Sequence, residues 1–298
     1  MRRASSLFFD EVVLLITRSW HKLLIAILTV LPKNLMSRVA GLLTSIPYPG
    51  PIAALNAKIF GMIFGVNFDE VKAPLSTFKS INQFFVRELK DGVRPIAEEA
   101  DAFASPCDAA WGQCGDVENN TILQVKGRPY SLSDLLGEDT SHFEGGTFAT
   151  LYLSPKDYHR FHSPCAATIR RSRYIPGKLW PVNAAGVNEV DGLFAKNERV
   201  VSFFEVEGGE IAIVPVGATM VGKIIIKYDE RLTSNVGGKN VIEAEYETPI
   251  DLDKGEEWGR FKFGSTLVLA ATKGVLDLDV QSAGTPVQLG KRIGTLHV

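Results

Sequence analysis

Residues 260–269 read RFKFGSTLVL and predict strand structure on both sides of a Gly-Ser step. Apolar side chains occupy every second position from Phe261 to Leu269 except Ser265, which is the pattern of a strand with one buried face. A glycine such as Gly264 within a strand often marks a place where another group approaches the backbone closely. Because Gly264 has no Cβ, its carbonyl is open to attack, and the Ser265 hydroxyl becomes a nucleophile once a base removes its proton. An isolated Gly-Ser step is otherwise an ordinary turn or bulge.

The sequence around this stretch predicts an α+β protein. From Ala104 onward, short β-branched runs alternate with Gly, Pro and Asp, which is typical of a mostly antiparallel β domain. The runs lie at 121–125, 147–153, 166–175, 199–205, 211–215, 220–227, 240–246, 267–270 and 275–280. Residues 105–112 and 284–290 loosely resemble turns of the lipoyl-type β-sandwich. We therefore expect N-terminal amphipathic helices followed by a mostly antiparallel β-sandwich or barrel with lipoyl-like turns.

The first 66 residues are apolar and predict helices that associate with a membrane without crossing it. The longest uncharged run of the first helical segment, Leu23–Pro32, has ten residues, whereas a spanning helix needs about 20. A narrow polar stripe, interrupted by apolar residues, favours a helix that lies in the membrane interface. The stripe consists of Glu11, Arg18, Lys22 and Thr29. The alternative is a helix packed on the protein's own core.

The next apolar segments are also unable to span. Three prolines break the uncharged stretch Val39–Ala57, and the segment Ile52–Val66 is too short and contains Lys58. The N-terminus begins Met1-Arg2-Arg3 and then turns polar and acidic without a clear cleavage site, so we expect no secretory signal. Residues 1–66 are thus predicted to form a membrane-associating helical region, and residues 67–298 the domain that carries the chemistry.

Composition excludes several classes of function. Lys and Arg total 32 and Asp and Glu total 34, for a formal net charge of −2. A nucleic-acid binder would normally carry a basic excess, so we expect no nucleic-acid partner. Cys107, Cys114 and Cys165 form an odd set without a CxxC spacing, which argues against disulfides and a structural zinc site. Buried, reduced cysteines in a reducing compartment fit this pattern.

Two of the five histidines lie in residues 153–164, LSPKDYHRFHSP. Ser154 can cap a short helix that has Pro155 at its first position. The segment therefore predicts a short helix or turn, with His159 and His162 on the same face of the helix. Polar surface histidines are the ordinary interpretation. We expect no metal site, because acidic or Cys partners at zinc spacing are missing.

Asp108 lies in the turn-like segment PCDAAWG, residues 106–112. An Asp beside such turns usually stabilises the turn itself. It gains a chemical interest because a histidine base needs a carboxylate to orient it. Asp, His and Ser residues far apart in sequence can still meet in a fold, since their roles matter more than their order.

Together these stretches resemble the prokaryotic phosphatidylserine decarboxylase proenzyme family, over most of the chain. Further matching segments are 84–87 with 93–96, 153–162, 174–177, 193–200 and 216–222. The family's processing motif is commonly Leu-Gly-Ser-Thr, and here residues 263–266 read Phe-Gly-Ser-Thr. A second departure follows Asp108, where Ala109 stands in place of the family's usual glycine.

The resemblance implies a self-cutting enzyme. Asp108, His162 and Ser265 would form the self-processing triad that cuts between Gly264 and Ser265. Ser265 would become a covalent pyruvoyl group, so that pyruvate is the cofactor. His159 would assist the later step, in which phosphatidylserine loses CO2 through a Schiff base to give phosphatidylethanolamine.

The resemblance also implies partners and a location. Residues 1–264 and 265–298 would stay together as a heterodimer, with a higher oligomer left open. The substrate is a bilayer lipid, so we expect a peripheral membrane protein at the cytoplasmic face of the bacterial inner membrane. Arg170, Arg171 and Arg173 are candidates for headgroup contact, and a solvated strand face is the alternative.

Two other functions remain open at this point. A serine hydrolase could use the same Asp108, His162 and Ser265 on an external ester, although the G-x-S-x-G elbow is missing. A lipid-binding β module without catalysis would need none of the three, since fold-level similarity alone never fixes function.

Overall fold

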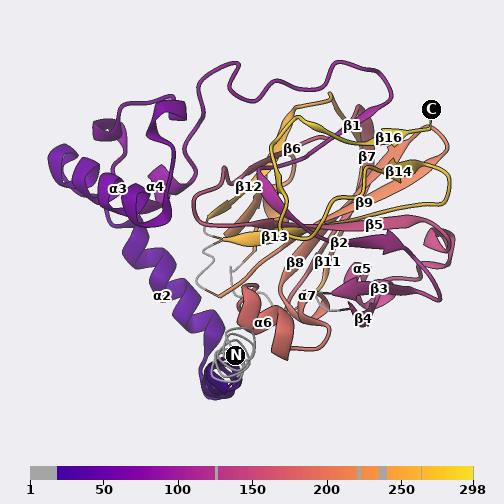
Figure 1. The fold of residues 1–298 in the computed structure, drawn as a ribbon, viewed down its shortest axis with the longest axis horizontal. Coiled ribbons are helices and arrows are strands. Elements are labelled where there is room, and N and C mark those ends of the chain that lie inside the picture. Colours follow the sequence, from indigo (N-terminus) through magenta and orange to yellow (C-terminus); the bar gives the residue numbers. More distant parts are fainter. Residues whose placement is uncertain (1–18, 125–126, 220–222, 235–239, 263, 298) are drawn as a thin grey trace, which may run out of the picture.

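The computed structural model describes residues 19–124, 127–219, 223–234, 240–262 and 264–297. Helices occupy the N-terminal part, and antiparallel strands in four sheets make up most of the remainder (Figure 1). The expected α+β class is confirmed. The helices α3 and α4 lie at one end of the molecule, away from the strands near the C-terminus (Figure 1).

The N-terminal helices bend sharply between their segments. A helix over Ser19–Val30 meets α2, Lys33–Ser45, at an angle of 92°. Within the described residues, this bent pair has the length and composition for a crossing, and no helix by itself does. Of the predicted polar stripe, Lys22 and Thr29 lie in the first helix, and Glu11 and Arg18 lie outside the described residues.

The helical region has a small core of its own. Helix α3, Gly50–Phe64, begins with Pro51 in its first turn and ends at Gly65 in a left-handed conformation, as helix ends commonly do. Helix α4, Ile81–Phe85, begins after Ser80, whose Oγ accepts a hydrogen bond from the Gln83 N–H. Two short 3-10 turns, η1 and η2, connect these helices, at Phe68–Glu70 and Leu75–Thr77. The core consists of Ala57, Val66, Val71, Phe78 and Phe84.

An eight-stranded antiparallel sheet forms the centre of the molecule, in the order β11-β7-β8-β9-β13-β5-β2-β15 (Figure 1). In that order the strands are Ile242–Leu252, Ala167–Ile175, Arg199–Val206, Gly209–Val216, Ser265–Ala271, Thr147–Leu153, Ala109–Asp116 and Pro286–Val287. Strand β13 lies between β9 and β5 and pairs with both along its length. Residues 265–269 of the RFKFGSTLVL stretch therefore lie in a central strand.

Three smaller sheets and several short helices cover the large sheet. The first contains β1, β16 and β14, at Ala102–Ala104, Arg292–Leu296 and Leu276–Leu278. The second contains β10, β12 and β6, at Lys223–Ile226, Glu257–Lys262 and Arg160–His162. The third is the ribbon of β3 and β4, at Thr121–Gln124 and Arg128–Ser131. The short helices are α5, η4, α6, α7 and η5, at Leu132–Leu136, Ser141–Phe143, Ala184–Glu189, Leu193–Lys196 and Glu230–Leu232.

Both faces of strand β13 are buried, each in a different core. Leu267 and Leu269 belong to a core that extends to the two three-stranded sheets and includes Phe161. Val268, on the opposite face, belongs to a core that includes Phe194 of α7. Because side chains alternate along a strand, Ser265 shares the face of Leu267, and Thr266 shares the face of Val268.

Candidate active site

Ser265 is the first residue of β13, at the point where the chain passes from one sheet to another. Strand β12 ends at Lys262 in a three-stranded sheet, and β13 begins in the central sheet. Strands therefore flank the Gly-Ser step on both sides, as predicted, but they belong to different sheets. A Cβ added to Gly264 would meet no atom within 4 Å, so the backbone there is open.

The Ser265 hydroxyl is held without a hydrogen-bond partner. The residue is fully buried, and its Oγ contacts no donor or acceptor among the described residues. Buried polar atoms in proteins are almost always satisfied, and leaving one unpaired costs about 1–3 kcal/mol. Such a group in a central strand is a candidate for chemistry rather than for packing.

The segment before His159 is a turn, so the helical alternative for this stretch is wrong. Asp157 Oδ2 accepts hydrogen bonds from the N–H and hydroxyl of Ser154, each at 2.7 Å. The chain then continues as β6, because Phe161 enters the core opposite Gly259 of β12. His159 and His162 therefore do not share a helix face.

His159 lies close to the start of β13. Its Nε2–H donates to the Ser154 carbonyl at 2.9 Å, and Ser154 follows Leu153, which is opposite Ser265 in the sheet. Its own carbonyl accepts from the Phe261 N–H at 2.9 Å. The ring stacks on Phe85, with centroids 4.0 Å apart. His159 is thus fixed on both sides to segments that lead into Ser265.

The His159 imidazole is neutral and has an unused acceptor. Burial, together with the nearby Arg87 charge, lowers its pKa to about 3. With Nε2 acting as donor, Nδ1 carries the lone pair, and this atom is buried without a partner among the described residues. The ring can therefore accept a proton at Nδ1 and carries no positive charge at neutral pH.

His162 is also an imidazole with one buried, unused nitrogen, but it lies in a different environment. Its Nδ1–H donates to the Gly255 carbonyl at 2.8 Å, and its Nε2 is buried without a partner among the described residues. Burial lowers its pKa as well. His162 pairs with Glu257 in the β6–β12 ladder. With about 3.3 Å per strand residue, it lies about 10 Å farther from the end of β12 than His159 does.

Asp108 is buried in an ion pair rather than bonded to a histidine. Its carboxylate accepts from Arg94 Nε and Nη2, at 2.9 and 2.8 Å, and from the Leu289 N–H at 2.9 Å. The pairing with Asp108 raises the pKa of Arg94. Among the described residues no hydrogen bond joins Asp108 to the His162 ring. The two segments are adjacent, since the Pro106 carbonyl accepts from the His162 N–H at 2.8 Å.

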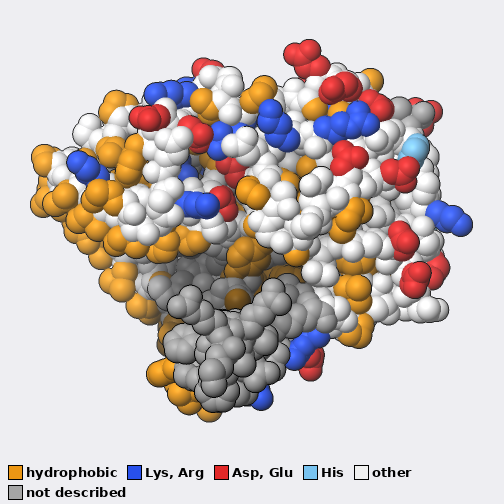
Figure 2. Space-filling model, in the orientation of Figure 1, with side chains coloured by type: hydrophobic (Ala, Val, Ile, Leu, Met, Phe, Trp, Pro, Cys, Tyr) orange, Lys and Arg blue, Asp and Glu red, His pale blue; other side chains and the backbone are white. Residues whose placement is uncertain are grey.

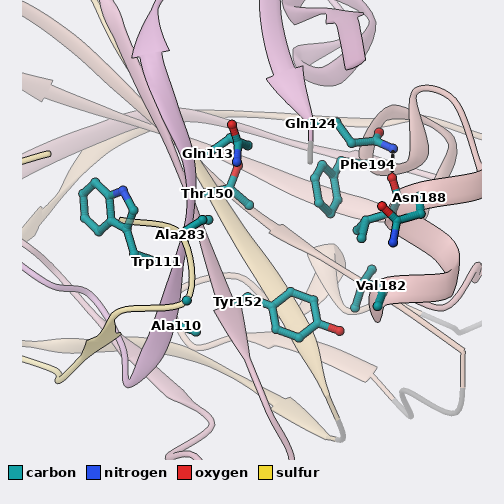
Figure 3. Close-up of a pocket in the computed structure, with 14 residues that line it drawn as sticks. Ala110, Trp111, Gln113, Gln124, Thr150, Tyr152, Val182, Asn188, Phe194 and Ala283 are labelled. Carbon is teal, nitrogen blue, oxygen red and sulfur yellow. Dashed lines mark hydrogen bonds between the residues drawn. The ribbon is translucent and has the colours of Figure 1, made fainter. Parts of the chain in front are cut away.

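A cavity of about 280 Å³ adjoins the other face of the same strands, where sequence analysis predicted no site (Figure 3). Tyr152, opposite Thr266 in the sheet, extends towards Val182 in this cavity (Figure 3). Thr150 and Phe194 line it as well. Burial raises the pKa of the Tyr152 phenol, so that it stays protonated and can donate. The only signal in the sequence is that Tyr152 alternates with the core residues of its strand.

A second cavity of about 410 Å³ connects Tyr152 to the charged residues. It is lined by Tyr152 and Ser154 together with Arg94 and Asp108. Tyr152 therefore lines both an apolar cavity and a charged one. The Thr266 hydroxyl, on the same sheet face, is buried without a partner among the described residues.

Other sequence candidates lie apart from these residues. Arg170 pairs with Glu205, Arg171 with Glu138 and Glu210, and Arg173 with Glu138 and Glu243. Their charges are thus offset by carboxylates. Within the described part of the chain, no group of three or more His, Cys, Asp or Glu side chains is arranged to hold a metal ion.

Comparison with known proteins identifies one family over most of this chain. Residues 81–295 match the family described as phosphatidylserine decarboxylase. The phosphatidylserine decarboxylase proenzyme of Anaeromyxobacter sp. strain K is 42% identical over 277 residues, covering 92% of this chain and 98% of that protein. The protein of the same name from Shewanella loihica is 43% identical over 265 residues, 86% and 92% of the two chains. That of Shewanella baltica is 44% identical over 260 residues, 85% and 88%.

Proposed function

We propose that this chain, which belongs to the phosphatidylserine decarboxylase family, cuts itself at Gly264–Ser265 and decarboxylates phosphatidylserine with a pyruvoyl group made from Ser265. Family membership makes it an enzyme of the phosphatidylserine decarboxylase type. The observation that carries the rest is the buried, unpartnered Ser265 hydroxyl, next to an open glycine and close to a neutral imidazole.

The self-cutting step requires only groups of the chain itself. The Ser265 hydroxyl attacks the Gly264 carbonyl as a base takes its proton, and the peptide bond becomes an ester with a free amine on Ser265. Because the two groups are covalent neighbours, proximity supplies much of the rate. Removal of the Ser265 Cα proton expels the Gly264 carboxylate and leaves dehydroalanine. Water then replaces the nitrogen, ammonia leaves, and a pyruvoyl group remains.

Either of two histidines could act as the base in this step. We assign it to His162, whose Nε2 lone pair is buried and unused while Gly255 fixes the Nδ1–H. His159 is the second candidate, because its contacts tie it to both segments that meet at Ser265, whereas His162 lies about 10 Å farther from the end of β12. In either case the lowered pKa keeps the ring in the form that accepts a proton.

Asp108 would act as the carboxylate member of the group. In the uncut chain its charge is balanced by Arg94, and Leu289 ties it to the C-terminal segment. The Pro106–His162 backbone bond keeps this turn beside β6. From this adjacent turn the carboxylate would stabilise positive charge that develops on His162 during the cut, without a direct hydrogen bond to the ring.

The architecture supports a two-chain product that stays assembled. Residues 265–298 would begin with β13, which pairs with β5 and β9 of the larger chain. Strands β15 and β16 of the same segment pair with β2 and β1. The cut would remove none of these ladders, so we propose a heterodimer of residues 1–264 and 265–298.

The decarboxylation would take place beside Thr266. The pyruvoyl group supplies a ketone that condenses with the substrate amine and a conjugated amide that accepts the electrons left by CO2. The enclosed Ser265 side chain fits such a group, and the next residue, Thr266, is opposite Tyr152, which lines the cavity on the other face of the strand. Tyr152 would donate a hydrogen bond to the substrate headgroup there.

His159 would supply the proton that replaces CO2. This needs a charged ring, whereas burial keeps His159 neutral before the cut. The cut creates a new carboxylate on Gly264 near this ring, and an adjacent negative charge raises the pKa of an imidazole. Self-cutting would thus prepare His159 for the second reaction.

We propose that the apolar N-terminal helices bring the site to a membrane. Hydrophobic side chains gather at the end of the molecule that carries α3 (Figure 2). The hydrophobic side chains on α2 and α3 with the highest exposed fractions are Leu35, Leu42, Leu43, Leu55, Met62 and Ile63. An exposed patch of this kind marks an interaction surface. Residues 1–66 would be the membrane-associating part, residues 67–298 the catalytic part, and the cytoplasmic face of the bacterial inner membrane the location.

Intact-mass measurement of the purified protein tests the proposal. We expect two chains that correspond to residues 1–264 and 265–298, the smaller one without a free N-terminal amine. Phosphatidylserine in detergent micelles should release CO2. A single full-length chain with an ordinary Ser265 would overturn the proposal and favour a hydrolase or a lipid-binding module.

A further inference from the structure

A third cavity, of about 360 Å³, lies between α2 and the strands β10 and β12. It is separate from the Tyr152 cavity and shares no lining residue with it. Among the described residues, all of its charged lining residues are basic, and no Asp or Glu lines it. The lining residues are Arg38, Gly41, Leu42, Ser45, Asn82, Lys223 and Lys262.

Two of these lysines face each other in a sheet. Lys223 of β10 is directly opposite Lys262 of β12. Neither forms an ion pair with any described residue. Like charges directly opposite in an antiparallel pair are destabilising. Burial lowers the pKa of Lys262, and Lys223 and Arg260 lower it further. An anion bound in the cavity would therefore reduce the repulsion between Lys223 and Lys262.

A polar side chain beside the lysines also has unused capacity. Asn82 is 7% exposed, and its Nδ2 donates to Ser45 Oγ at 2.8 Å. Its Oδ1 is buried without a partner among the described residues. Asn82 lines the cavity together with Lys223 and Lys262, so the wall of the cavity is polar as well as basic.

The rim of the cavity is apolar and continuous with an exposed helix face. Leu42 lines the cavity and is also 71% exposed. Leu35, Val39 and Leu43 of the same helix are exposed as well. A ligand with a phosphate at one end and hydrocarbon at the other would place each part in a matching environment.

We propose that this basic cavity binds the headgroup phosphate of a membrane phospholipid whose acyl chains lie along α2. The lipid need not be the substrate, because the cavity is distinct from the one beside Thr266. Occupancy would neutralise the charge at the end of β12, immediately before the Gly264–Ser265 link. The site would thus hold the enzyme on an anionic bilayer independently of catalysis.

Flotation with vesicles tests this site without using the reaction. Wild type and the double variant Lys223→Gln/Lys262→Gln are compared on phosphatidylcholine vesicles that contain phosphatidylglycerol. Since each Lys near an anionic surface contributes about 1 kcal/mol, we expect about 10-fold weaker binding or more. The control Lys273→Gln/Lys291→Gln removes the same charge from exposed positions outside the cavity and should lose less than about 3-fold.

Two further measurements decide the interpretation. Because a repulsive pair is removed, the double variant should melt at the same or a higher temperature than wild type. Glycerol 3-phosphate should compete poorly with vesicles, since it lacks acyl chains. Equal losses in both double variants would reduce the effect to general surface charge and overturn the site. Full competition by glycerol 3-phosphate would assign the cavity to soluble phosphate esters and overturn the lipid. Self-cutting is scored separately by mass, so failure here leaves the proposed function untouched.

Discussion

Ser265 lies directly opposite Leu153 in the central sheet, and the residue after Leu153 holds the His159 ring through its carbonyl. Strand pairing and one side-chain–backbone hydrogen bond therefore connect Ser265 to the His159 imidazole in the neighbouring segment. This arrangement depends on strand register, because a shift by one residue would turn Ser265 to the opposite face.

Replacing Ser265 with Ala should leave a full-length, folded chain. The substitution removes the proposed nucleophile, a buried hydroxyl that has no partner among the described residues. Because leaving such a group unpaired costs about 1–3 kcal/mol, the free energy of unfolding should not fall. Intact mass and urea denaturation measure both effects. Ser282→Ala, at an exposed position, should be cut like wild type. Normal cutting of Ser265→Ala would exclude Ser265 as the nucleophile.

Alanine substitution of the two histidines should separate their roles. His162→Ala should slow the cut by about 10²- to 10⁴-fold, as expected for a lost base. His159→Ala should still be cut but should decarboxylate poorly. Time courses of chain cutting and CO2 release measure the two steps. His142→Ala removes an exposed ring and should affect neither. If His159→Ala is the variant that stays uncut, His159 is the base.

The lowered histidine pKa values predict a pH dependence of stability. Unfolding returns His159 from a pKa of about 3 to its ordinary value near 6.5. Between these values the unfolded state binds more protons, so stability rises with pH and is lost as pH falls below about 6.5. The slope approaches about 1.4 kcal/mol per pH unit for each such histidine.

Urea denaturation of Ser265→Ala at several pH values checks this slope. Ser265→Ala/His159→Phe, which has no titrating group at this position, should show a shallower slope between about pH 6.5 and pH 4. The rate of self-cutting by wild type should be flat above pH 6.5, because the base is already neutral there. An inflection of that rate at pH 6.5 would indicate a base with an ordinary pKa.

Breaking the Asp108–Arg94 pair should cost both stability and cutting. The two side chains are 9% and 12% exposed, and removal of one partner from a buried pair costs about 3–5 kcal/mol. Asp108→Asn should therefore unfold at lower urea and should not be cut. Glu70→Gln removes the more exposed partner of Arg94 and should have a smaller effect on both. A stable Asp108→Asn chain that is cut at the normal rate would remove Asp108 from the site.

Tyr152→Phe should separate substrate binding from self-cutting. The phenol lines the cavities but makes no hydrogen bond that the fold depends on among the described residues. We expect normal cutting and a loss of about 10-fold in kcat/KM for phosphatidylserine, as for one hydrogen bond of about 1.4 kcal/mol. Tyr48→Phe, at a 37% exposed position, is the control. Unchanged kinetics would place the headgroup elsewhere.

Local patterns in the sequence predicted most strands of the fold. The runs at 147–153 and 199–205 correspond closely to β5 and β8, since alternation and β-branched residues reflect local geometry. Strand β2 was not predicted, because its residues, AAWGQCGD, have little β-branched character. The segment before His159 begins with Ser154 and Pro155, which are typical of a helix start. It forms a turn followed by strand β6 instead, because Phe161 packs in the core.

The site could be predicted only as separate pieces. The Gly264–Ser265 step and both histidines stand out in the sequence because of their chemistry. Their relative placement depends on register and on which sheet each strand joins, which no local pattern encodes. For the same reason the sequence did not show that Arg94 would balance Asp108, or that Lys223 would face Lys262.

The central position of β13 has a consequence for the lifetime of the enzyme. A cut at Gly264 leaves the middle strand of the sheet on a short segment of its own, held by its two neighbouring strands. Before the cut, refolding involves one molecule; afterwards two pieces must find each other, and the apolar strand is exposed to aggregation until they do. Heat should therefore inactivate the matured protein irreversibly, whereas uncut Ser265→Ala recovers on cooling. The cut that makes the enzyme active would therefore also prevent it from refolding after it unfolds.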